Sequence, residues 1–247
     1  MTVAGSCLQL DVGNSSAKWR LLHNGVVAAR GKYVAAEQAS LAALLACTEQ
    51  PEHIWISSVA TAEAEADLAR LLQDRWGVTP WFARTQARHG DLTNSYAEPQ
   101  RMGVDRWLVM LAARARVRKR VCVVDAGSAL TIDLVAADGR HEGGYIIPGP
   151  ALMERALLLD TDRVRFDEEV EYQLTPGAST AAAVRHGIAL AQAGAVAMAI
   201  DRAAGEPVQL LFCGGGGETL MQLLDRGGLY LPDLVFEGLG AMAASVV

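Results

Sequence analysis

The stretch LQLDVGNSSAKWRLLHNG, residues 8–25, decides the fold. An apolar run ends on Asp11, passes through Gly13 and three small polar residues, and resumes as a second apolar run up to Asn24-Gly25. Short apolar runs bounded by turn residues predict β-strands, and an Asn-Gly pair predicts a tight type I′ turn into a third strand. The stretch therefore predicts a three-stranded meander whose first bend carries a carboxylate, a glycine and small hydrogen-bonding side chains.

A second copy of this pattern, VVDAGSALTIDLVAADG, occupies residues 123–139. Asp125 lies 114 positions after Asp11, and Gly127 and Asp138-Gly139 keep the same distance from their counterparts. Self-similarity at one fixed spacing indicates a duplicated unit. We expect a second meander with the same type I′ turn at Asp138-Gly139.

The segments that follow each meander also match in outline. The first half predicts a helix at 36–47, a strand at 53–59, a helix at 61–76 closed by Gly77, and a strand at 79–83. The second half predicts helices at 150–159 and 179–203, a strand at 208–213, a helix from Gly216, a strand at 234–236 and a last helix. The order βββαβαβ twice predicts an α/β fold of two halves, 1–118 and 119–247, each a mixed sheet flanked by helices.

Composition narrows the class of protein. A net charge of -6 argues mildly against a nucleic-acid or acidic-membrane partner. The longest weakly polar stretch, 187–200, is interrupted by Gln192 and Gly194 and is shorter than the roughly 20 apolar residues of a membrane span. No secretion signal is recognisable, and the four scattered cysteines predict buried free thiols. We expect a cytoplasmic protein, in which the basic cluster at 114–120 is a solvated helix end.

The two bends have the chemistry of phosphate loops. Glycine and small residues expose backbone N–H groups and let a phosphate approach, and the side chains of Asn14, Ser15, Ser16, Ser128 and Thr131 add donors. Lys18 either adds positive charge or points to solvent. Asp11 and Asp125 would repel phosphate unless a cation lay between, so each implies a metal or its water shell. One such loop alone would favour a hairpin without a ligand, but two at one spacing favour a bound nucleotide polyphosphate.

Two further segments have both a plain and a functional interpretation. The glycines at 214–217 follow a strand and open a helix, which suits either a tight turn or an adenosine-binding surface. In YAEPQRMGVDRWLVMLAARA, residues 96–115, Asp105 stands near a helix start. It either complements the helix dipole or acts as a general base, with Arg106 for an anionic substrate group and Tyr96 closing the pocket.

The motifs DVGNSSAKW, YAEPQRMGVDRW, DAGSALTIDLV, GGYIIPG (143–149) and FCGGGGE, in this order, resemble the type III pantothenate kinases over essentially the whole chain. The resemblance implies two ribonuclease H-like halves of the actin-like ATPase kind. It also implies a homodimeric, ATP-dependent enzyme of coenzyme A biosynthesis that phosphorylates pantothenate to 4′-phosphopantothenate, with Mg²⁺ and a monovalent cation, K⁺ or NH₄⁺.

The resemblance also assigns roles by position. The first ATP phosphate loop is Asp11, Val12, Gly13, Asn14, Ser15, Ser16, Ala17 and Lys18, with Asp11 reaching Mg²⁺ through water. The pantothenate contacts, from the segment 96–107 and beyond, are Tyr96, Gly103, Val104, Asp105, Arg106 and Thr180, and Asp105 is the proton acceptor. Asp125 holds the monovalent cation and Ser128, where the family more often has threonine, contacts ATP. From sequence alone, Ser179 or Thr180 is more simply a helix N-cap.

Two other functions fit parts of the pattern. One is a kinase of a different small hydroxylated substrate, which a substrate panel would distinguish. The other is a non-catalytic nucleotide-binding regulatory or accessory protein with the 114–120 cluster as its partner surface. The Asp105-Arg106 pair argues against the second, because a nucleotide clamp without turnover does not need a base.

Overall fold

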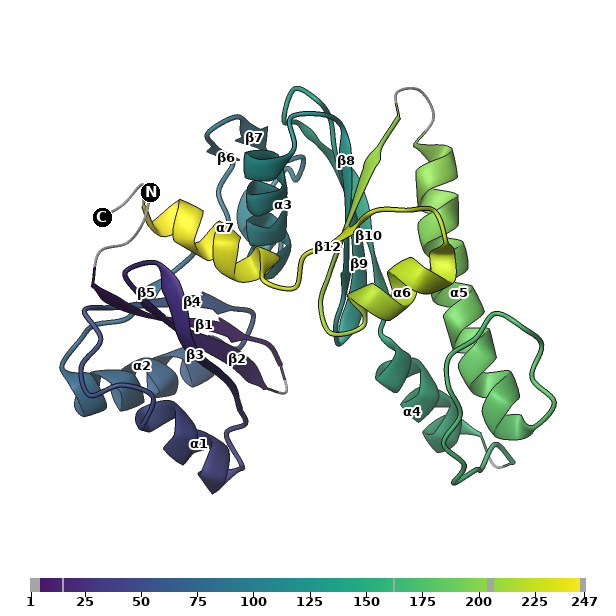
Figure 1. The fold of residues 1–247 in the computed structure, drawn as a ribbon, viewed down its shortest axis with the longest axis horizontal. Coiled ribbons are helices and arrows are strands. Elements are labelled where there is room, and N and C mark those ends of the chain that lie inside the picture. Colours follow the sequence, from purple (N-terminus) through teal and green to yellow (C-terminus); the bar gives the residue numbers. More distant parts are fainter. Residues whose placement is uncertain (1–4, 15, 162, 204–206, 245–247) are drawn as a thin grey trace. The chain divides into compact units, whose positions relative to one another are not determined.

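The computed structural model describes residues 5–14, 16–161, 163–203 and 207–244, which form two compact units (Figure 1). The first unit comprises the described residues up to Gly90, Tyr96–Ala112, and those from Leu234 on. The second comprises Asp91–Ser95 and the described part of 113–233. The boundary at 118/119 that the repeat suggests stays a prediction, and in the structure the last helix belongs to the first unit.

The first unit is built on a five-stranded mixed sheet in the order β3-β2-β1-β4-β5. Its elements are β1 (Ser6–Val12), β2 (Ala17–His23), β3 (Val26–Tyr33), α1 (Gln38–Leu45), β4 (His53–Ser58), α2 (Ala62–Trp76), β5 (Trp81–Phe82), β6 (Arg88–His89), a 3₁₀ helix (Pro99–Arg101), the start of α3 (Val104–Arg116), and α7 (Leu234–Ala243). β1 pairs antiparallel with β2 and parallel with β4. Because β1 and β4 are parallel neighbours, their carboxyl ends lie at the same edge of the sheet.

The second unit repeats this topology, with a sheet in the order β10-β9-β8-β11-β12. Its elements are β7 (Leu92–Thr93), β8 (Val121–Ala126), β9 (Ala129–Val135), β10 (His141–Pro148), α4 (Pro150–Asp160), α5 (Thr180–Arg202), β11 (Gln209–Cys213), α6 (Gly217–Leu224) and β12 (Leu229–Tyr230). In each unit the first strand of the meander has a parallel neighbour: β1 pairs with β4, and β8 pairs with β11. The predicted fold class, duplicated ribonuclease H-like halves of the actin-like ATPase kind, is confirmed.

The core of the first unit lies between its sheet and the helices α1 and α2. Leu44 of α1 and Leu68, Leu72 and Trp76 of α2 pack on the buried side chains of β1, β2 and β4. α2 forms as the sequence predicts: the Thr61 hydroxyl accepts from Ala64 N at 3.3 Å, and Gly77 ends the helix with φ 69°. The opposite face of the sheet receives α7, which contacts β1 and β4.

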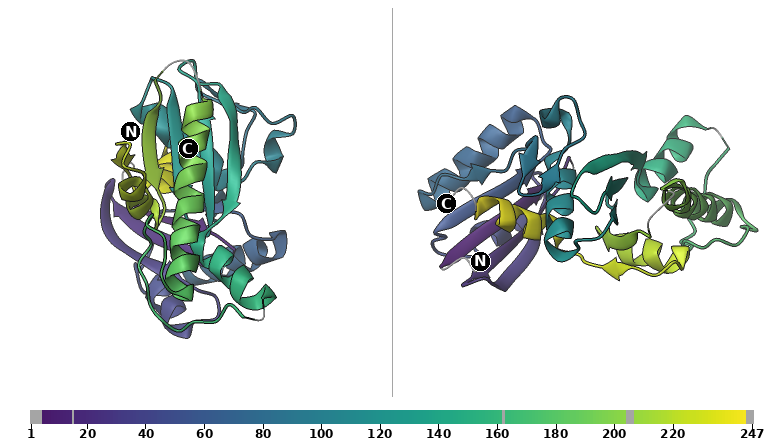
Figure 2. Two further views of the ribbon diagram at one scale, coloured as in Figure 1. Left: turned by 90° about the vertical axis from the view of Figure 1, so that its right-hand side faces the viewer. Right: turned by 90° about the horizontal axis from the view of Figure 1, so that it is seen from above.

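The core of the second unit lies between its sheet and the helices α5 and α6. Ala193, Val196 and Ala199 of α5 and Leu220 of α6 pack on β8, β9 and β11, and Figure 2 shows α5 lying along the sheet. α5 extends from Thr180 to Arg202, in agreement with the helix predicted at 179–203. By length and composition alone it could cross a membrane. Core helices of soluble proteins pass the same test, so this is weak evidence.

Two local predictions were wrong. Residues 234–236 begin α7 instead of forming a strand, because Leu234, Gly238, Leu239 and Met242 are buried at helical spacing; Leu229–Tyr230 form the edge strand. The first turn has positive φ at Asn24 and Gly25, as a type I′ turn requires. At the second, φ is positive at Gly139 but not at Asp138. This turn is longer, with Ala136 N bonded to Arg140 O, and the Asp138 carboxylate accepts from Arg140 N.

Gly238→Ala is expected to destabilise the first unit. α7 approaches α3 so closely that a Cβ at position 238 would overlap the carbonyl group of Leu108, whereas a Cβ at Gly240 would meet only Gln9 Nε2 at 3.5 Å and Trp55 at 4.0 Å. Overpacking should lower the Tm of Gly238→Ala by about 3 to 10 °C. The matched variant Gly240→Ala should be neutral or slightly stabilising, because alanine favours helix. Equal melting temperatures in thermal unfolding would contradict the close contact.

Candidate active site

The first predicted phosphate loop is the bend between β1 and β2. The antiparallel ladder runs to the pair Val12 and Ala17, and Gly13 N donates to Ser16 O at 3.0 Å across the bend. Asn14 is exposed and borders, with Gly13 and Ser16, a cavity of about 320 Å³. Ser15 lies outside the described residues. The bend thus presents a glycine and polar side chains.

Asp11 is the last polar residue of β1 before this bend. Its strand neighbours are Lys18 on β2 and Ser57 on β4, and the Ser57 hydroxyl donates to Asp11 Oδ1 at 3.1 Å. Burial is the main cause that raises the pKa of Asp11 to about 6, and the negative charge of Asp105 raises it further. Ser57 and Lys18 act in the opposite direction. The Asp11 and Asp105 carboxyl groups are therefore electrostatic neighbours within the first unit.

Asp105 lies in the first turn of α3. Its Oδ1 accepts from the backbone N of Arg106 at 2.8 Å, so it does complement the helix start as the plain interpretation expected. A Cβ at Gly103 would lie 2.5 Å from the same oxygen. Glycine at position 103 therefore leaves space for the Asp105 carboxylate in this rotamer. The preceding segment is fastened by the Thr85 hydroxyl, which donates to Met102 O at 2.9 Å.

Arg106 and Tyr96 lie against each other in the same unit. Arg106 is only 4% exposed, and its Nη1 donates to the Tyr96 hydroxyl at 2.9 Å. The guanidinium carbon lies 5.8 Å from the centre of the Tyr96 ring. Val104 is buried at the helix start. The structure thus brings together Tyr96, Gly103, Asp105 and Arg106, as the sequence predicted for one segment.

The second predicted phosphate loop joins β8 and β9. Gly127 N donates to Ala129 O at 2.9 Å, and the exposed Ser128 is held through its carbonyl by Gly149 N at 3.0 Å. Gly149 sits so close that its Cβ would lie 2.5 Å from Ser128 O. The backbone at Gly149, the last residue of GGYIIPG, therefore approaches this loop closely.

Asp125, the penultimate residue of β8, lies beside the glycines at 214–217. A Cβ at Gly214 would overlap Asp125 Oδ1 and lie 2.5 Å from Ala126 O, and Gly214 has φ 79°. Gly216 N donates to Ala126 O at 2.9 Å. The turn that opens α6 is thus packed directly on the second loop. Gly214 and Gly216 therefore lie against the end of β8 that carries Asp125.

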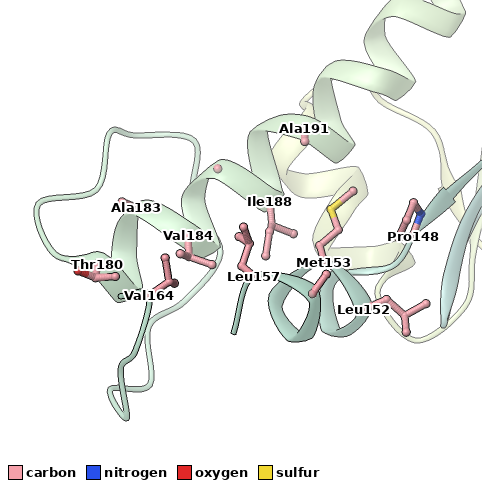
Figure 3. A pocket seen from close by; sticks show the side chains of 12 residues that line it. Pro148, Leu152, Met153, Leu157, Val164, Thr180, Ala183, Val184, Ile188 and Ala191 are labelled. Carbon is pink, nitrogen blue, oxygen red and sulfur yellow. The ribbon is translucent and has the colours of Figure 1, made fainter. Parts of the chain in front are cut away.

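Thr180 is the first residue of α5, and Ser179 is the N-cap, with its Oγ accepting from Ala182 N at 3.1 Å. Thr180 lines an apolar cavity of about 730 Å³ between α4 and α5. Figure 3 shows Met153 and Leu157 of α4 and Ile188 of α5 pointing into it. Thr180 lies in the second unit, whereas Tyr96 and Arg106 lie in the first. The structure therefore leaves its predicted substrate role as a prediction.

The expectation that the 114–120 cluster is a solvated helix end was wrong for Arg114. Its side chain is 3% exposed, and its guanidinium donates to Asp91 Oδ2 at 2.7 Å and to Ala137 O at 3.2 Å. Arg120 is paired with Glu142 at 2.6 Å. These arginines tie the end of α3 and the start of β8 to their own unit. Arg116 and Arg118 remain exposed.

Sequence reasoning missed Ser57. It is fully buried at the carboxyl end of β4 and orients Asp11. Its counterpart in the second unit is Cys213, which is paired in register with Asp125. A polar residue at the end of a buried parallel strand is a known signal for ligand sites in α/β sheets, and it could have indicated Ser57.

The carboxyl groups of Asp11 and Asp105 could supply only part of the coordination of Mg²⁺. No group of three or more His, Cys, Asp or Glu side chains gathers as a metal site within the described ranges. Mg²⁺ typically needs only one or two carboxylates when substrate phosphates and waters supply the rest. The neighbouring Asp11 and Asp105 carboxyl groups, with the Asp11 pKa raised, fit a site whose charge a cation would balance.

Comparison with known proteins gives the family. The family model for type III pantothenate kinase matches residues 7–202. The chain belongs to the type III pantothenate kinase family. A type III pantothenate kinase of Hahella chejuensis is 35% identical over 242 residues, 97% of this chain and 98% of that protein. One of Thiobacillus denitrificans is 37% identical over 244 residues, 98% of each chain. Membership confirms the predicted enzyme class.

Solved structures with lower identity support the fold alone. A conserved Baf family protein from Campylobacter jejuni is 24% identical, with a TM-score of 0.62 over 97% of this chain and 98% of its own. Component A of (R)-2-hydroxyglutaryl-CoA dehydratase from Acidaminococcus fermentans is 12% identical, with a TM-score of 0.53 over 98% and 97%. These likenesses support the duplicated α/β fold over nearly the whole chain.

Proposed function

We propose that this chain transfers the γ-phosphate of ATP to the terminal hydroxyl of pantothenate and so forms 4′-phosphopantothenate in the first step of coenzyme A biosynthesis. Family membership supports the reaction. The observation that supports the site is the Asp105 carboxylate, which has space because position 103 is glycine and which lies beside the buried Arg106.

Asp105 is the proposed general base. As the hydroxyl oxygen of pantothenate bonds to the γ-phosphorus, its proton passes to the Asp105 carboxylate and the bond to the β-phosphate oxygen breaks. The backbone N–H of Arg106 at 2.8 Å stabilises the charged form of the base before transfer. Val104 and Gly103 supply the adjoining contacts.

Arg106 is proposed to pair with the pantothenate carboxylate. A guanidinium can bind a carboxylate through two parallel hydrogen bonds, which lysine cannot do. Its low exposure strengthens such a pair, because water screens it less. Tyr96 holds the guanidinium in place through its hydroxyl at 2.9 Å and completes the substrate contacts. Thr180 is proposed as a further contact.

The two bends are proposed to bind the phosphates of ATP. Residues 11–18 form the first loop, in which Asp11 reaches Mg²⁺ through water, and Ser128 contributes its exposed hydroxyl in the second. Mg²⁺ supplies charge neutralisation for the phosphates. The 214–217 turn is proposed to face the adenosine. Its four glycines have no side chains, and the turn leads into the N-terminus of α6.

Asp125 is proposed to hold a monovalent cation. Asp125→Ala should abolish any stimulation by K⁺, because it removes the carboxylate that is proposed to hold the cation. Initial rates across a K⁺ titration, at saturating ATP and pantothenate, measure this. Asp138→Ala, which removes an exposed carboxylate from the same unit, is the matched control. A K⁺ response in Asp125→Ala equal to that of wild type would rule out this placement.

A homodimer is proposed to form through exposed apolar side chains of the second unit. Tyr145 and Ile146 of β10, Leu152 and Leu159 of α4, and Leu190 and Met198 of α5 are all more than 40% exposed. Large apolar side chains that are exposed in one chain can be covered in an interface. We also propose that the enzyme works in the cytoplasm.

A direct assay tests the proposed function: phosphate transfer from ATP to pantothenate, with and without Mg²⁺ and K⁺. Product formation that needs Mg²⁺ is the expected result. If ATP is consumed only with another hydroxylated substrate in a parallel panel, the substrate assignment is wrong. If nucleotide binds but no substrate is phosphorylated, the chain is a non-catalytic regulatory or accessory protein.

A further inference from the structure

Ser57, at the carboxyl end of β4, has a buried hydroxyl that the proposed reaction does not use. Its side chain is fully buried, and its hydroxyl donates to Asp11 Oδ1 at 3.1 Å. The two residues are partners in the parallel pairing of β1 and β4, so their side chains lie on the same face of the first sheet. Both residues belong to the first unit.

The face of the sheet on which Ser57 lies is not the face that packs on α1 and α2. Ile56, the preceding residue of β4, is part of that core, and successive side chains of a strand point to opposite faces. Ser57 therefore points to the side of Asp11 and of its other strand partner, Lys18. A hydroxyl without a partner would be costly at a fully buried position, and the Asp11 carboxylate is the partner that it has.

The second unit shows that a hydroxyl is not needed to build this sheet position. The equivalent residue there is Cys213, which is paired in register with Asp125 and is 1% exposed. A thiol is also small, but it is only a weak hydrogen-bond donor. The position therefore accepts a side chain without a strong donor, so packing alone does not explain why residue 57 is serine.

We propose that Ser57 is a positioning residue that fixes the Asp11 carboxylate for the water shell of Mg²⁺. The inference rests on the proposed function, in which Asp11 reaches the cation that is bound with ATP. A carboxylate offers about four lone-pair positions, so one bond from Ser57 at Oδ1 leaves the others for water. Partners of this kind orient the groups that hold a metal, and their loss typically weakens metal binding or activity by roughly 10- to 100-fold. Ser57 acts only through Asp11.

Ser57→Ala and Ser57→Cys together separate the hydrogen bond from packing. Ser57→Ala should raise the KM for MgATP about tenfold, with the KM for pantothenate within about twofold of wild type. Ser57→Cys fills the space but donates weakly, so it should also raise the KM for MgATP, by at least about threefold. A wild-type KM for MgATP in Ser57→Cys would mean that residue 57 only fills space, and would overturn the proposal.

The matched control is Ser58→Ala. Ser58 is the next residue of the same strand, is 7% exposed, and its hydroxyl accepts from Ala60 N at 3.3 Å. Because its side chain points to the opposite face of the sheet, its removal should leave the KM for MgATP unchanged. Thermal unfolding of all the variants shows whether each is folded. An equal rise in Ser58→Ala would mean a general disturbance of β4 and would overturn the proposal.

A second readout does not need turnover. Calorimetric titration with MgADP should show a Kd about tenfold higher in Ser57→Ala than in wild type. If Ser57 acts through Asp11, adding Ser57→Ala to Asp11→Ala should weaken MgADP binding no further. Additive losses in this double-mutant cycle would contradict the inference, as would unchanged MgADP binding in Ser57→Ala.

Failure of the proposed function looks different from failure of this inference. The wild-type enzyme would then form no phosphorylated pantothenate, whereas titration with MgADP would still show whether Ser57 supports nucleotide binding. Weaker MgADP binding in Ser57→Ala would support the inference even in that case. Absence of MgADP binding by the wild type would overturn both.

Discussion

Asp105→Asn lowers kcat by about 10²- to 10⁴-fold if Asp105 is the general base, because proton transfer by a positioned side chain contributes that much. Asparagine has the same shape and keeps an oxygen to accept from Arg106 N, so the helix start should survive. The loss should therefore appear in kcat, with the KM for pantothenate changed little. Steady-state kinetics at saturating MgATP measure both constants.

The matched control is Asp74→Asn, which removes an exposed carboxylate from α2 of the same unit. It should leave kcat unchanged. Thermal unfolding of both variants shows whether they are folded. Turnover of Asp105→Asn within threefold of wild type, in folded protein, would remove Asp105 from the mechanism and leave only its role at the start of α3.

The two bends could be predicted because their signals are local. A strand that ends near an Asp and is followed by glycine and small residues specifies a bend within a few residues. The same pattern at residues 123–139 predicted the second bend. The helix start at Asp105 is local too. The residues alone indicated only a loop at Gly103, and the resemblance added a substrate contact. Neither indicated that a Cβ at position 103 would lie 2.5 Å from Asp105 Oδ1.

The contacts that could not be predicted join distant parts of the chain. Ser57 and Asp11 are 46 residues apart and meet only because β1 and β4 are parallel neighbours. Ser95 and His141 are also 46 residues apart, and a bulge in β10 accompanies the turn of His141 inward. α7 packs on the first sheet although it follows the second unit in sequence. Periodicity shows that a helix has an apolar face but not which sheet covers it.

Asp11→Asn is expected to lower kcat/KM for MgATP by at least about 100-fold, because the loss of a carboxylate that helps to hold Mg²⁺ removes several kcal/mol of charge stabilisation. In the wild type the same constant should fall as the pH drops below about 6, the pKa of Asp11, since the protonated carboxyl no longer attracts the cation. Saturating Mg²⁺ should move this fall to lower pH. A pH profile unaffected by Mg²⁺ would argue against a cation at Asp11.

The folding stability should depend on pH in the opposite sense to kcat/KM: it should fall as the pH rises. Burial and Asp105 raise the Asp11 pKa from 3.8 to about 6, so the folded protein keeps a proton that the unfolded chain releases between these values. The folding stability contributed by this group is therefore fully present below pH 3.8, the unfolded pKa, and is lost as the pH rises through about 6. Asp11→Asn escapes this cost and should melt about 2 to 4 °C above wild type at pH 7.5 without Mg²⁺, as roughly 1 kcal/mol does in a chain of this size. The gain should vanish near pH 4, and it should also shrink in the Asp105→Asn background, where the repelling charge is gone. A variant that melts below wild type at pH 7.5 would mean that the Asp11 carboxylate stabilises the first unit instead of being held there for binding.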